Sequence, residues 1–168
     1  MAELQQRSAR RLGLPAPPMS FFTRTCAHLQ TLGLADLLLA RIPTGDRVAA
    51  IVLWKGRSEW IYAFGASLPE HWEHRPNHLL LWTALEGAVA AGVRFDLGRA
   101  APEQKGLVAF KEHWGGERLS LAYDYWPATG GLHALPRDRG LLAVGSRIWS
   151  HLPLALTRRA SFLYRYLG

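Results

Sequence analysis

The stretch from Pro76 to Trp126 changes its hydrophobic period several times, and this succession constrains the fold more than any other part of the chain. It predicts a helix that stops at Gly92, then a strand, a short helix that stops at Gly115, and another strand. These elements are expected over 77–91, 93–98, 107–114 and 117–126. A helix that joins two strands of one sheet predicts a right-handed β-α-β crossover.

Three β-rich runs precede this stretch and predict an antiparallel meander. The strands are expected over 36–42, 47–54 and 59–66. The turns between them are Pro43–Asp46 and Lys55–Ser58, which are short enough for hairpins. Upstream, helices are expected over 1–12 and 21–32, with Ser20 as the N-cap of the second. The predicted fold is therefore α/β, with a mixed, mostly antiparallel sheet flanked by helices.

The C-terminal residues predict an amphipathic helical arm. A helix is expected over 141–167 with a kink at Pro153, and helical spacing places Arg147, Arg158 and Arg165 on one face. The arm has three interpretations: it packs on the domain, lies on an anionic membrane surface, or binds a partner helix. The predicted divisions are an N-terminal helix and proline-rich link, the α/β domain, a linker and the arm, over 1–19, 20–126, 127–140 and 141–168.

Charge and cysteine content narrow the classes of partner and compartment. The net charge of +7 lies at the two ends of the chain, because residues 25–138 carry 11 bases and 12 acids. A broad basic face for nucleic acid is therefore not expected on the body. Cys26, the one cysteine, has no partner for an intramolecular disulfide, which favours a reducing compartment. No signal peptide or membrane-spanning run is apparent, so the expected location is cytoplasmic.

The order of three antiparallel strands, a helix, a strand, a short helix and a strand resembles the core of the GNAT acyltransferase fold. The segments PNHLLLWTALEGAVAAGVRFDLGR, FKEHWGG and LAYDYW are similar to the C-terminal half of FemAB-like acetyltransferases. That group includes proteins associated with exosortase and exopolysaccharide systems, and the tail RIWSHLPLALTRRASFLYRYLG resembles their C-terminal arm. The resemblance covers residues 20–168. Proteins of this group contain two GNAT-like halves, whereas this chain has room for one.

The resemblance implies an N-acyltransferase that acts on an amine of a cell-envelope or polysaccharide precursor. The donor would be acyl-CoA or aminoacyl-tRNA, no metal would be needed, and the amine would attack the carbonyl directly. The single half implies pairing with a second GNAT half or with another copy. The alternative is a non-catalytic half-domain that pairs in this way or docks to the inner membrane through residues 141–168.

The candidate catalytic residues are Lys111 and Asp96. The resemblance places the FKEHWGG motif beside the cleft, where the ammonium of Lys111 would stabilise the negative charge that acyl transfer develops on the carbonyl oxygen. Asp96 lies in the expected strand 93–98 and would order the cleft or bind the amine. Arg99 and Trp114 are the expected substrate contacts. The alternatives are a solvent-facing Lys111, an Asp96 in an ion pair with Arg99 or Lys111, and a Trp114 that packs on Phe110.

The candidate donor-binding residues are Arg75, Asn77 and His78, at the N-terminus of the helix expected over 77–91. A helix N-terminus attracts anions such as a diphosphate. However, the glycine-rich turn Q/R-x-x-G-x-G/A of CoA-binding GNAT members is absent, and Pro76 removes one N–H donor. The alternative is that Asn77 only caps the helix. His71 lies close to two further histidines, which are expected to be exposed loop residues rather than metal ligands.

Overall fold

The computed structural model describes residues 1–122 and 139–166 and divides the chain into two units. The first unit contains Met1–Gly98 and Gly145–Gly168, and the second contains Arg99–Val144. The sheet formed by the described residues lies entirely within the first unit. The division of the chain expected from the sequence, at residues 19, 126 and 140, stays a prediction.

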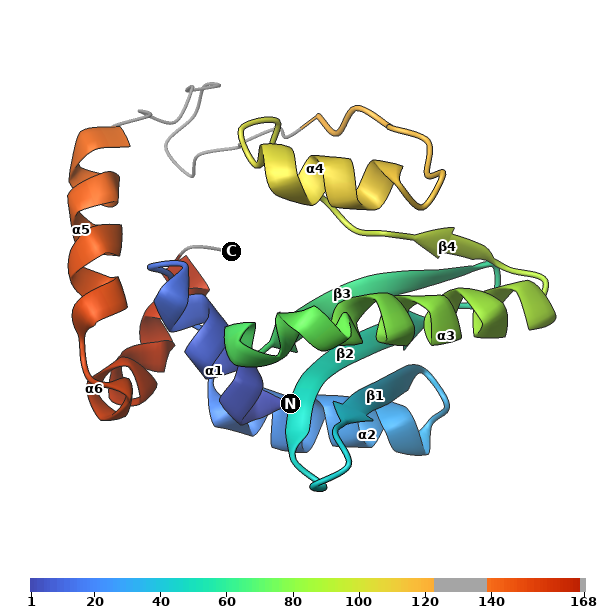
Figure 1. Cartoon of the computed structure of the whole chain (residues 1–168), viewed down its shortest axis with the longest axis horizontal. Coiled ribbons are helices and arrows are strands. Elements are labelled where there is room, and N and C mark those ends of the chain that lie inside the picture. The colour runs from blue at the N-terminus through green and yellow to red at the C-terminus, as the bar shows by residue number, and fades with distance from the viewer. Residues whose placement is uncertain (123–138, 167–168) are drawn as a thin grey trace, which may run out of the picture. The chain divides into compact units, whose positions relative to one another are not determined.

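The sheet has four strands in the order β1-β2-β3-β4 (Figure 1). Their bounds are β1 Ala35–Arg41, β2 Arg47–Lys55, β3 Glu59–Ser67 and β4 Arg94–Asp96. The first three form an antiparallel meander, and β4 lies parallel to β3. This arrangement confirms the predicted α/β class with a mixed, mostly antiparallel sheet flanked by helices. The strand β4 is shorter than predicted because the Asp96 carboxylate accepts a hydrogen bond from the Gly98 N–H at 2.6 Å, a local turn that ends the strand.

Helix α3 (Pro76–Ala90) connects β3 to β4 and covers one face of the sheet (Figure 1). Its buried residues include Leu80, Leu81 and Ala84, and the first and last of these join Ile51 and Leu53 of β2 in the core. The helix approaches the sheet closely at Gly87, where a Cβ would lie 3.0 Å from the Trp60 ring. The helix ends as the sequence predicts, just before a glycine at positive φ.

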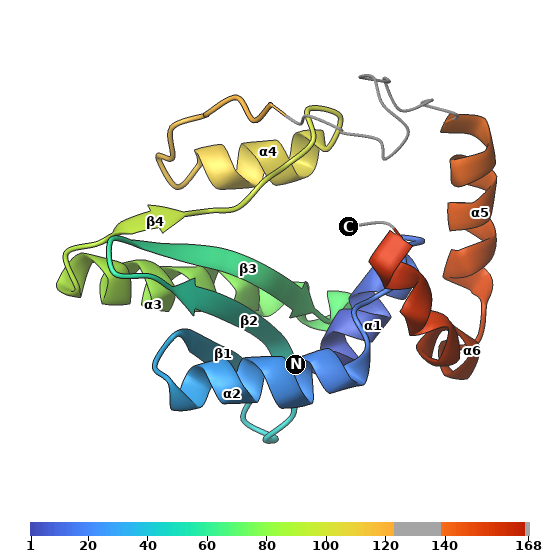
Figure 2. The ribbon, with the colours of Figure 1, turned by 180° about the vertical axis from the view of Figure 1, so that it is seen from behind.

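The opposite face of the sheet is covered by N-terminal helices (Figure 2). They are α1 (Ala2–Arg11) and a π-helical turn, Phe21–Cys26, that runs into α2 (Ala27–Thr31). Phe64 of β3 packs edge-to-face against Phe22 and Phe21 of the π-helical turn, with ring centres 5.5 and 5.6 Å apart. The predicted N-cap role of Ser20 is wrong: Ser20 has helical φ and ψ, and its side chain makes no capping hydrogen bond.

The C-terminal segment is broken rather than continuous. Helix α5 (Arg139–His151) ends before Pro153, whose extended ψ of 141° starts α6 (Leu154–Arg159), and a 3₁₀ helix follows over Ala160–Tyr166. The predicted single arginine face is therefore wrong, because no continuous helix carries it. Helix α6 packs against α1, with Arg158 Nε donating to Gln6 Oε1 at 2.7 Å.

The second unit contains helix α4 (Lys105–Glu112), two residues earlier at each end than predicted. It terminates before Gly115, which has φ of +72°. The strand expected after it is wrong over residues 117–122, which form no strand. Leu119 and Leu121 are 78% and 63% exposed, so their alternation marks no buried sheet face. The rest of that expected strand, 123–126, lies outside the described residues.

Candidate active site

The parallel strands β3 and β4 pair over a short length and then separate. Three residue pairs hold them together: Glu59 with Arg94, Trp60 with Phe95, and Ile61 with Asp96. Beyond the last pair, β3 continues to Ser67 whereas β4 has ended. Among residues 1–122 and 139–166, no strand pairs with the outer edge of β3 over 62–67. The first unit therefore presents a backbone edge beside a point of strand divergence.

A β-bulge lies on β3 immediately after this divergence. Leu53 pairs with Tyr62 and Val52 pairs with Phe64, so Ala63 has no partner on β2. A bulge re-aims backbone groups and is common next to active sites. Farther along, the Leu68 N–H donates to β2, and the alternation of an antiparallel ladder then directs the backbone groups of Gly65 away from β2. The edge thus carries N–H and C=O groups that a ligand can reach.

Tyr62 places a phenol beside this edge. Its side chain packs against the core under α3, and burial raises its pKa above the ordinary tyrosine value. The hydroxyl lies directly over Gly65, where an added Cβ would overlap it. The glycine therefore makes the room in which the Tyr62 hydroxyl sits. Sequence reasoning missed both residues, because nothing in a strand pattern shows which side chain crosses which backbone.

A group of hydrogen bonds ties the end of β3 to the start of α3. Ser67, 8% exposed, accepts hydrogen bonds at its hydroxyl from Trp72 Nε1 at 2.8 Å and from Asn77 Nδ2 at 2.9 Å. The guanidinium of Arg11, on α1, lies 5.1 Å from the centre of the Trp72 ring. Asn77 therefore does not cap the helix, which corrects that alternative: its side chain reaches back to the strand.

The N-terminus of α3 begins with Arg75, which has a strained backbone conformation, and Pro76. Arg75 is the N-cap residue and has φ of 48°, the only positive φ among the non-glycine residues described. Pro76 follows and has no N–H, while the N–H groups of His78 and Leu79 both donate to the Arg75 carbonyl, at 3.0 and 3.3 Å. Arg75 and His78 are exposed. This helix end offers few backbone donors to an anion.

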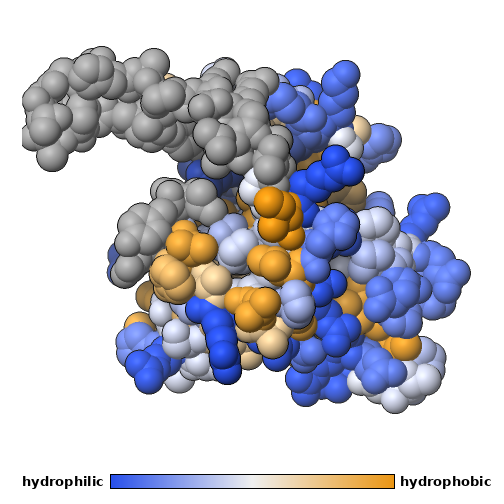
Figure 3. Space-filling model, turned by 90° about the vertical axis from the view of Figure 1, so that its left-hand side faces the viewer, coloured by the Kyte–Doolittle hydropathy of each residue, from blue (hydrophilic) through white to orange (hydrophobic). Residues whose placement is uncertain are grey.

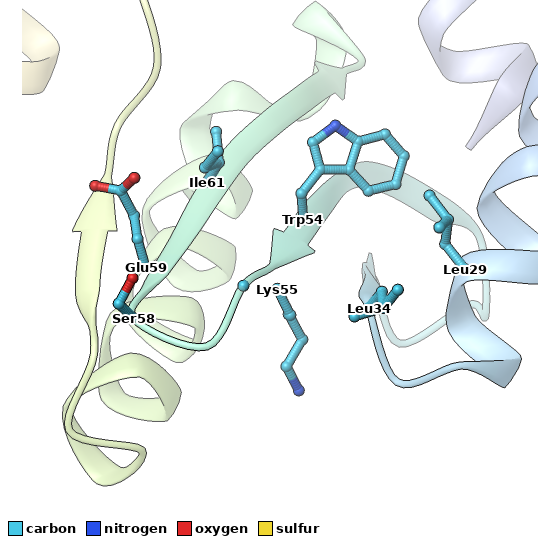
Figure 4. A pocket seen from close by; sticks show the side chains of 8 residues that line it. Leu29, Leu34, Trp54, Lys55, Ser58, Glu59 and Ile61 are labelled. Carbon is cyan, nitrogen blue, oxygen red and sulfur yellow. The ribbon is translucent and has the colours of Figure 1, made fainter.

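An open pocket of about 430 Å³ lies at the other end of β3, on the side of α2 (Figure 4). Apolar side chains of Leu29, Trp54 and Ile61 line it, together with the polar groups of Lys55 and Glu59. Ile61 also forms the last pair between β3 and β4, so the pocket reaches the divergence. The Lys55 ammonium lies 2.9 Å from Asp36 Oδ2 and 4.3 Å from the centre of the Trp60 ring.

Asp96 and Arg94 both project from the exposed side of β4. The Asp96 backbone pairs with Ile61, which places this carboxylate at the divergence, and the carboxylate accepts the Gly98 N–H. Arg94 lies 3.7 Å from Glu59 in an exposed ion pair. Asp96 is thus a surface residue with a turn-forming role, and its predicted catalytic role stays a prediction.

Three further predicted residues lie in the second unit and are close to one another. The Lys111 ammonium, in the last turn of α4, donates to the Arg99 carbonyl at 2.7 Å. This contact ties the start of the 99–104 loop to the helix. Trp114 packs edge-on against Phe110 with ring centres 6.3 Å apart, which confirms the predicted pairing of these two aromatics. Roles for Lys111, Arg99 and Trp114 in chemistry stay predictions.

The described parts of the chain carry neither a group of three metal ligands nor a membrane-spanning helix. No group of three or more His, Cys, Asp and Glu side chains there could hold a metal ion. His71 and His74 stack on each other with ring centres 6.2 Å apart. Within residues 1–122 and 139–166, every helix is too short or too polar to span a bilayer.

Comparison with known proteins identifies the family of this chain and other proteins that share its fold. A family model described as an acetyltransferase (GNAT) domain matches residues 1–112. Curated protein sequences gave no match. Three solved structures of low sequence identity share the fold and are similar over most of their length.

The first is an acetyltransferase from Trypanosoma brucei, with 16% identity, a TM-score of 0.52, and coverage of 74% of this chain and 94% of that one. The second is AAC(6')-Iy in complex with the bisubstrate analogue CoA-S-monomethyl-acetylneamine, with 12% identity, a TM-score of 0.59, and coverage of 74% and 91%. The third is a ribosomal-protein-alanine N-acetyltransferase from Brucella melitensis biovar Abortus, with 15% identity, a TM-score of 0.55, and coverage of 73% and 87%. Because the family model matches two thirds of its residues, the chain belongs to the GNAT acetyltransferase family.

Proposed function

We propose that this protein is an N-acyltransferase that transfers an acyl or aminoacyl group to an amine, with the reaction at the divergence of β3 and β4. The observation that carries the proposal is the edge of β3 over 62–67, which lies beside a bulge and which no strand of residues 1–122 and 139–166 pairs with. A donor that contains amide groups can add to such an edge as an extra strand would. The N–H groups at the bulge then lie where the donor carbonyl would sit.

The protein's part in the reaction is positioning and charge stabilisation. The amine nitrogen bonds to the carbonyl carbon, negative charge develops on the carbonyl oxygen, and the bond to the leaving sulfur or oxygen then breaks. Backbone N–H groups near Ala63 would stabilise that oxygen. The role that the family resemblance gives the Lys111 ammonium, stabilisation of an oxyanion, is kept as a separate prediction and is tested by mutation below. Asp96, at the divergence, would hold the incoming amine. The leaving group takes the proton that the amine loses.

The pocket beside Ile61 is the proposed acceptor site. It opens on the side of α2, whereas α3 covers the other face, so an amine and a donor could reach the divergence from different sides. The Glu59 carboxylate would attract a protonated amine, which releases one proton to water before it attacks, and the apolar wall would accept a carbon skeleton. The resemblance to FemAB-like proteins suggests an envelope or polysaccharide precursor as this acceptor.

Of the two parts of an acyl-CoA donor, the pantetheine arm suits this protein and the diphosphate does not. Its pantetheine arm carries two amides and suits the open edge of β3. Its diphosphate does not suit the N-terminus of α3, because Pro76 has no N–H and the N–H groups of His78 and Leu79 are bonded to the Arg75 carbonyl. The assignment of Arg75, Asn77 and His78 to a donor phosphate thus stays a prediction that the backbone geometry does not favour.

The proposal is tested by acyl transfer with three donors, an acyl-CoA, an acyl-pantetheine and an aminoacyl-tRNA, against a panel of amines. Lys111→Ala should lower kcat by about 10²-fold, as loss of one oxyanion donor does elsewhere. Lys105→Ala, at the start of the same helix, is the matched control and should keep the wild-type kcat. Absence of transfer with every donor would overturn the proposal.

A second candidate function is membrane or partner docking through the C-terminal segment. Ile148, Leu156 and Phe162 are 59%, 50% and 55% exposed, and Arg147 and Arg159 are exposed near them in sequence. Figure 3 shows one side of the molecule on which hydrophobic residues lie among strongly hydrophilic ones. Such a mixture suits an anionic lipid surface, and a half-domain could dock there or pair with a second GNAT half.

Liposome sedimentation tests the docking candidate. Binding to vesicles of phosphatidylglycerol and phosphatidylcholine should fall at least about fivefold in the Ile148→Ser/Phe162→Ser variant, because buried apolar area contributes to interfacial binding. Thr83→Ala, on α3, serves as the control. Equal sedimentation of all three proteins would exclude this segment as the contact.

A further inference from the structure

We infer that this protein recognises its donor through the acyl-pantetheine end alone, so that the nucleotide of acyl-CoA adds no affinity. The inference rests on the proposed function and names the substrate class of that same site. Acyl-pantetheine could arrive as a small thioester or as the arm of a carrier protein. The reacting bond is the same in both, and only the group beyond the pantetheine differs.

The backbone at the end of β3 provides the first argument. A diphosphate at a helix N-terminus is held by free N–H groups. Here the Arg75 N–H donates to the Trp72 carbonyl at 2.9 Å, the His78 and Leu79 N–H groups donate to the Arg75 carbonyl, and Pro76 has no N–H. Most of the donors that would hold a diphosphate are thus used within the connection itself, and the Asn77 N–H is the exception in the first turn of α3.

Close approach of a diphosphate is also blocked by side chains. The sequence has no glycine between Gly65 and Gly87, so each residue of the connection carries a Cβ. Trp72 and Asn77 both donate to the buried Ser67 hydroxyl, so these two side chains lie between the strand end and the helix start. A ligand would have to break these two hydrogen bonds to enter.

The charge of the connection does not replace the missing N–H groups. Glu70 and Glu73 accompany Arg75 in the segment, and both are exposed. The nearby Arg11 guanidinium lies over the Trp72 ring rather than over the helix end. Because the two carboxylates oppose a diphosphate, the segment is no cationic substitute for a backbone cradle.

The edge of β3 can still bind an acyl-pantetheine through its backbone groups. The outward groups of Gly65 and the bulge at Ala63 offer backbone donors and acceptors to its amides. Aminoacyl-tRNA has no such amides along its ester end, so the open edge favours a pantetheine thioester over this alternative. Affinity and position would both come from the edge.

A carrier protein fits the surface next to this site better than a small thioester does. Helices α1 and α6 pack together and carry five arginines against one glutamate: Arg7, Arg10, Arg11, Arg158 and Arg159 against Glu3. The Arg11 contact with Trp72 joins this surface to the end of β3. Complementary charge of this kind speeds association with an acidic partner and depends on salt.

Two measurements test the inference. First, kcat/KM for acetyl-pantetheine should equal that for acetyl-CoA within about threefold, whereas an enzyme that binds the diphosphate through two charged hydrogen bonds would lose about 100-fold. Second, calorimetric titration with adenosine 3′-phosphate 5′-diphosphate, the nucleotide half of CoA, should give no saturable binding at millimolar concentration. A 100-fold preference for acetyl-CoA, or saturable nucleotide binding, would overturn the inference.

Further experiments distinguish a small thioester from a carrier protein as the donor. They also distinguish failure of this inference from failure of the proposed function. An acetylated carrier protein should be used more efficiently than acetyl-pantetheine at low salt, and equal use would leave the small thioester as the donor. Pro76→Ala/Asn77→Gly, which restores an N–H and removes one of the two side chains bonded to the Ser67 hydroxyl, should gain nucleotide affinity, while Pro69→Ala should not. Reaction with aminoacyl-tRNA but with no thioester would refute this inference and keep the transferase function; no reaction at all would refute the proposed function.

Discussion

At the scale of single residues, the contact of Tyr62 with Gly65 connects the hydrophobic core to the candidate site, because Tyr62 packs on the core and Gly65 lies on the edge of β3. The two residues lie on the same face of β3 although three positions separate them, because the bulge at Ala63 adds one residue between them. The hydroxyl consequently rests on backbone, in a position that only glycine at 65 allows. Exchange of either residue should therefore affect the edge on which the donor is proposed to lie.

Gly65→Ala should destabilise the protein by about 1–3 kcal/mol, because the new methyl group overlaps the Tyr62 hydroxyl and forces the ring to move. Urea unfolding measures the change in the free energy of unfolding. Gly106→Ala is the control, since its Cβ would meet no atom within 4 Å and alanine is the better helix former. A Gly65→Ala variant as stable as the wild type would refute this packing account.

Tyr62 should also make stability depend on pH above 10. Burial raises its pKa in the folded state, so the unfolded chain loses this proton at lower pH than the folded protein does. The contribution is fully present below about pH 10, the ordinary tyrosine value, and is lost as pH rises from there through the folded pKa. Urea unfolding between pH 8 and 11 should show a smaller loss in Tyr62→Phe than in the wild type.

Cys26 should be slow to react with thiol reagents. It is the last residue of the π-helical turn, is 6% exposed and packs in the aromatic cluster there, and burial raises the pKa of its thiol. Reaction with Ellman's reagent at pH 8 should be at least about tenfold slower in the folded protein than in urea, because thiolate is the nucleophile. Fast reaction of the folded protein would show an accessible thiol, contrary to the structure.

At the scale of elements, helix α3 is held at its start and along its buried face. Leu80, Leu81 and Ala84 bury its inner face, and the hydrogen bonds at Ser67 fix its first turn to β3. The start of the helix therefore moves with the strand, which keeps the connection closed. A glycine-rich connection would give this helix end free N–H groups instead.

Ser67→Ala should cost more stability than Asn77→Ala. Removal of the hydroxyl leaves two partly buried donors, Trp72 Nε1 and Asn77 Nδ2, without their acceptor, at about 1–3 kcal/mol. Asn77→Ala removes one hydrogen bond and should cost about 1 kcal/mol. Urea unfolding ranks the two, and Thr83→Ala, on an exposed part of α3, should stay within about 0.5 kcal/mol of the wild type. The reverse order would contradict the arrangement at Ser67.

At the scale of the whole molecule, the first unit is assembled from both ends of the chain. Arg158 joins them: it donates to Gln6 on α1 and lies 3.8 Å from Glu3, while Arg10 donates to the Leu152 carbonyl at 3.2 Å. The family match at residues 1–112 and the C-terminal segment are therefore linked in space. The basic surface proposed for a carrier protein depends on this link.

Arg158→Ala should loosen α6 from α1 without unfolding the sheet. Hydrogen–deuterium exchange should rise in residues 154–159 and stay unchanged in β2, whose central residues are almost fully buried. Arg159→Ala is the control, because that residue is exposed and the hydrogen bond and ion pair that join α6 to α1 are made by Arg158. Faster exchange in β2 would show that the two ends stabilise the sheet as well.

The sequence by itself determined the order and type of most elements. The three meander strands, the helix that ends before Gly92 and the pairing of Phe110 with Trp114 all follow from periodicity and glycine positions, which act within a few residues. The FKEHWGG motif identified Lys111 as a candidate, and the structure adds its contact with the Arg99 carbonyl. Local rules succeed here because helices and turns are decided by neighbouring backbone groups.

Tertiary structure decided where the site lies and which groups it offers. The separation of β3 from β4, the bulge at Ala63 and the bond between Asn77 and Ser67 each depend on residues that are distant in sequence. A strand pattern gives the face of each side chain but not the strand that it pairs with. The sequence over 117–126 therefore predicts a strand as strongly as the sequence of β4 does, although residues 117–122 form none. Because β4 ends at Asp96, no strand in the described part of the chain covers the edge of β3 beyond Ile61, and only the folded chain shows this.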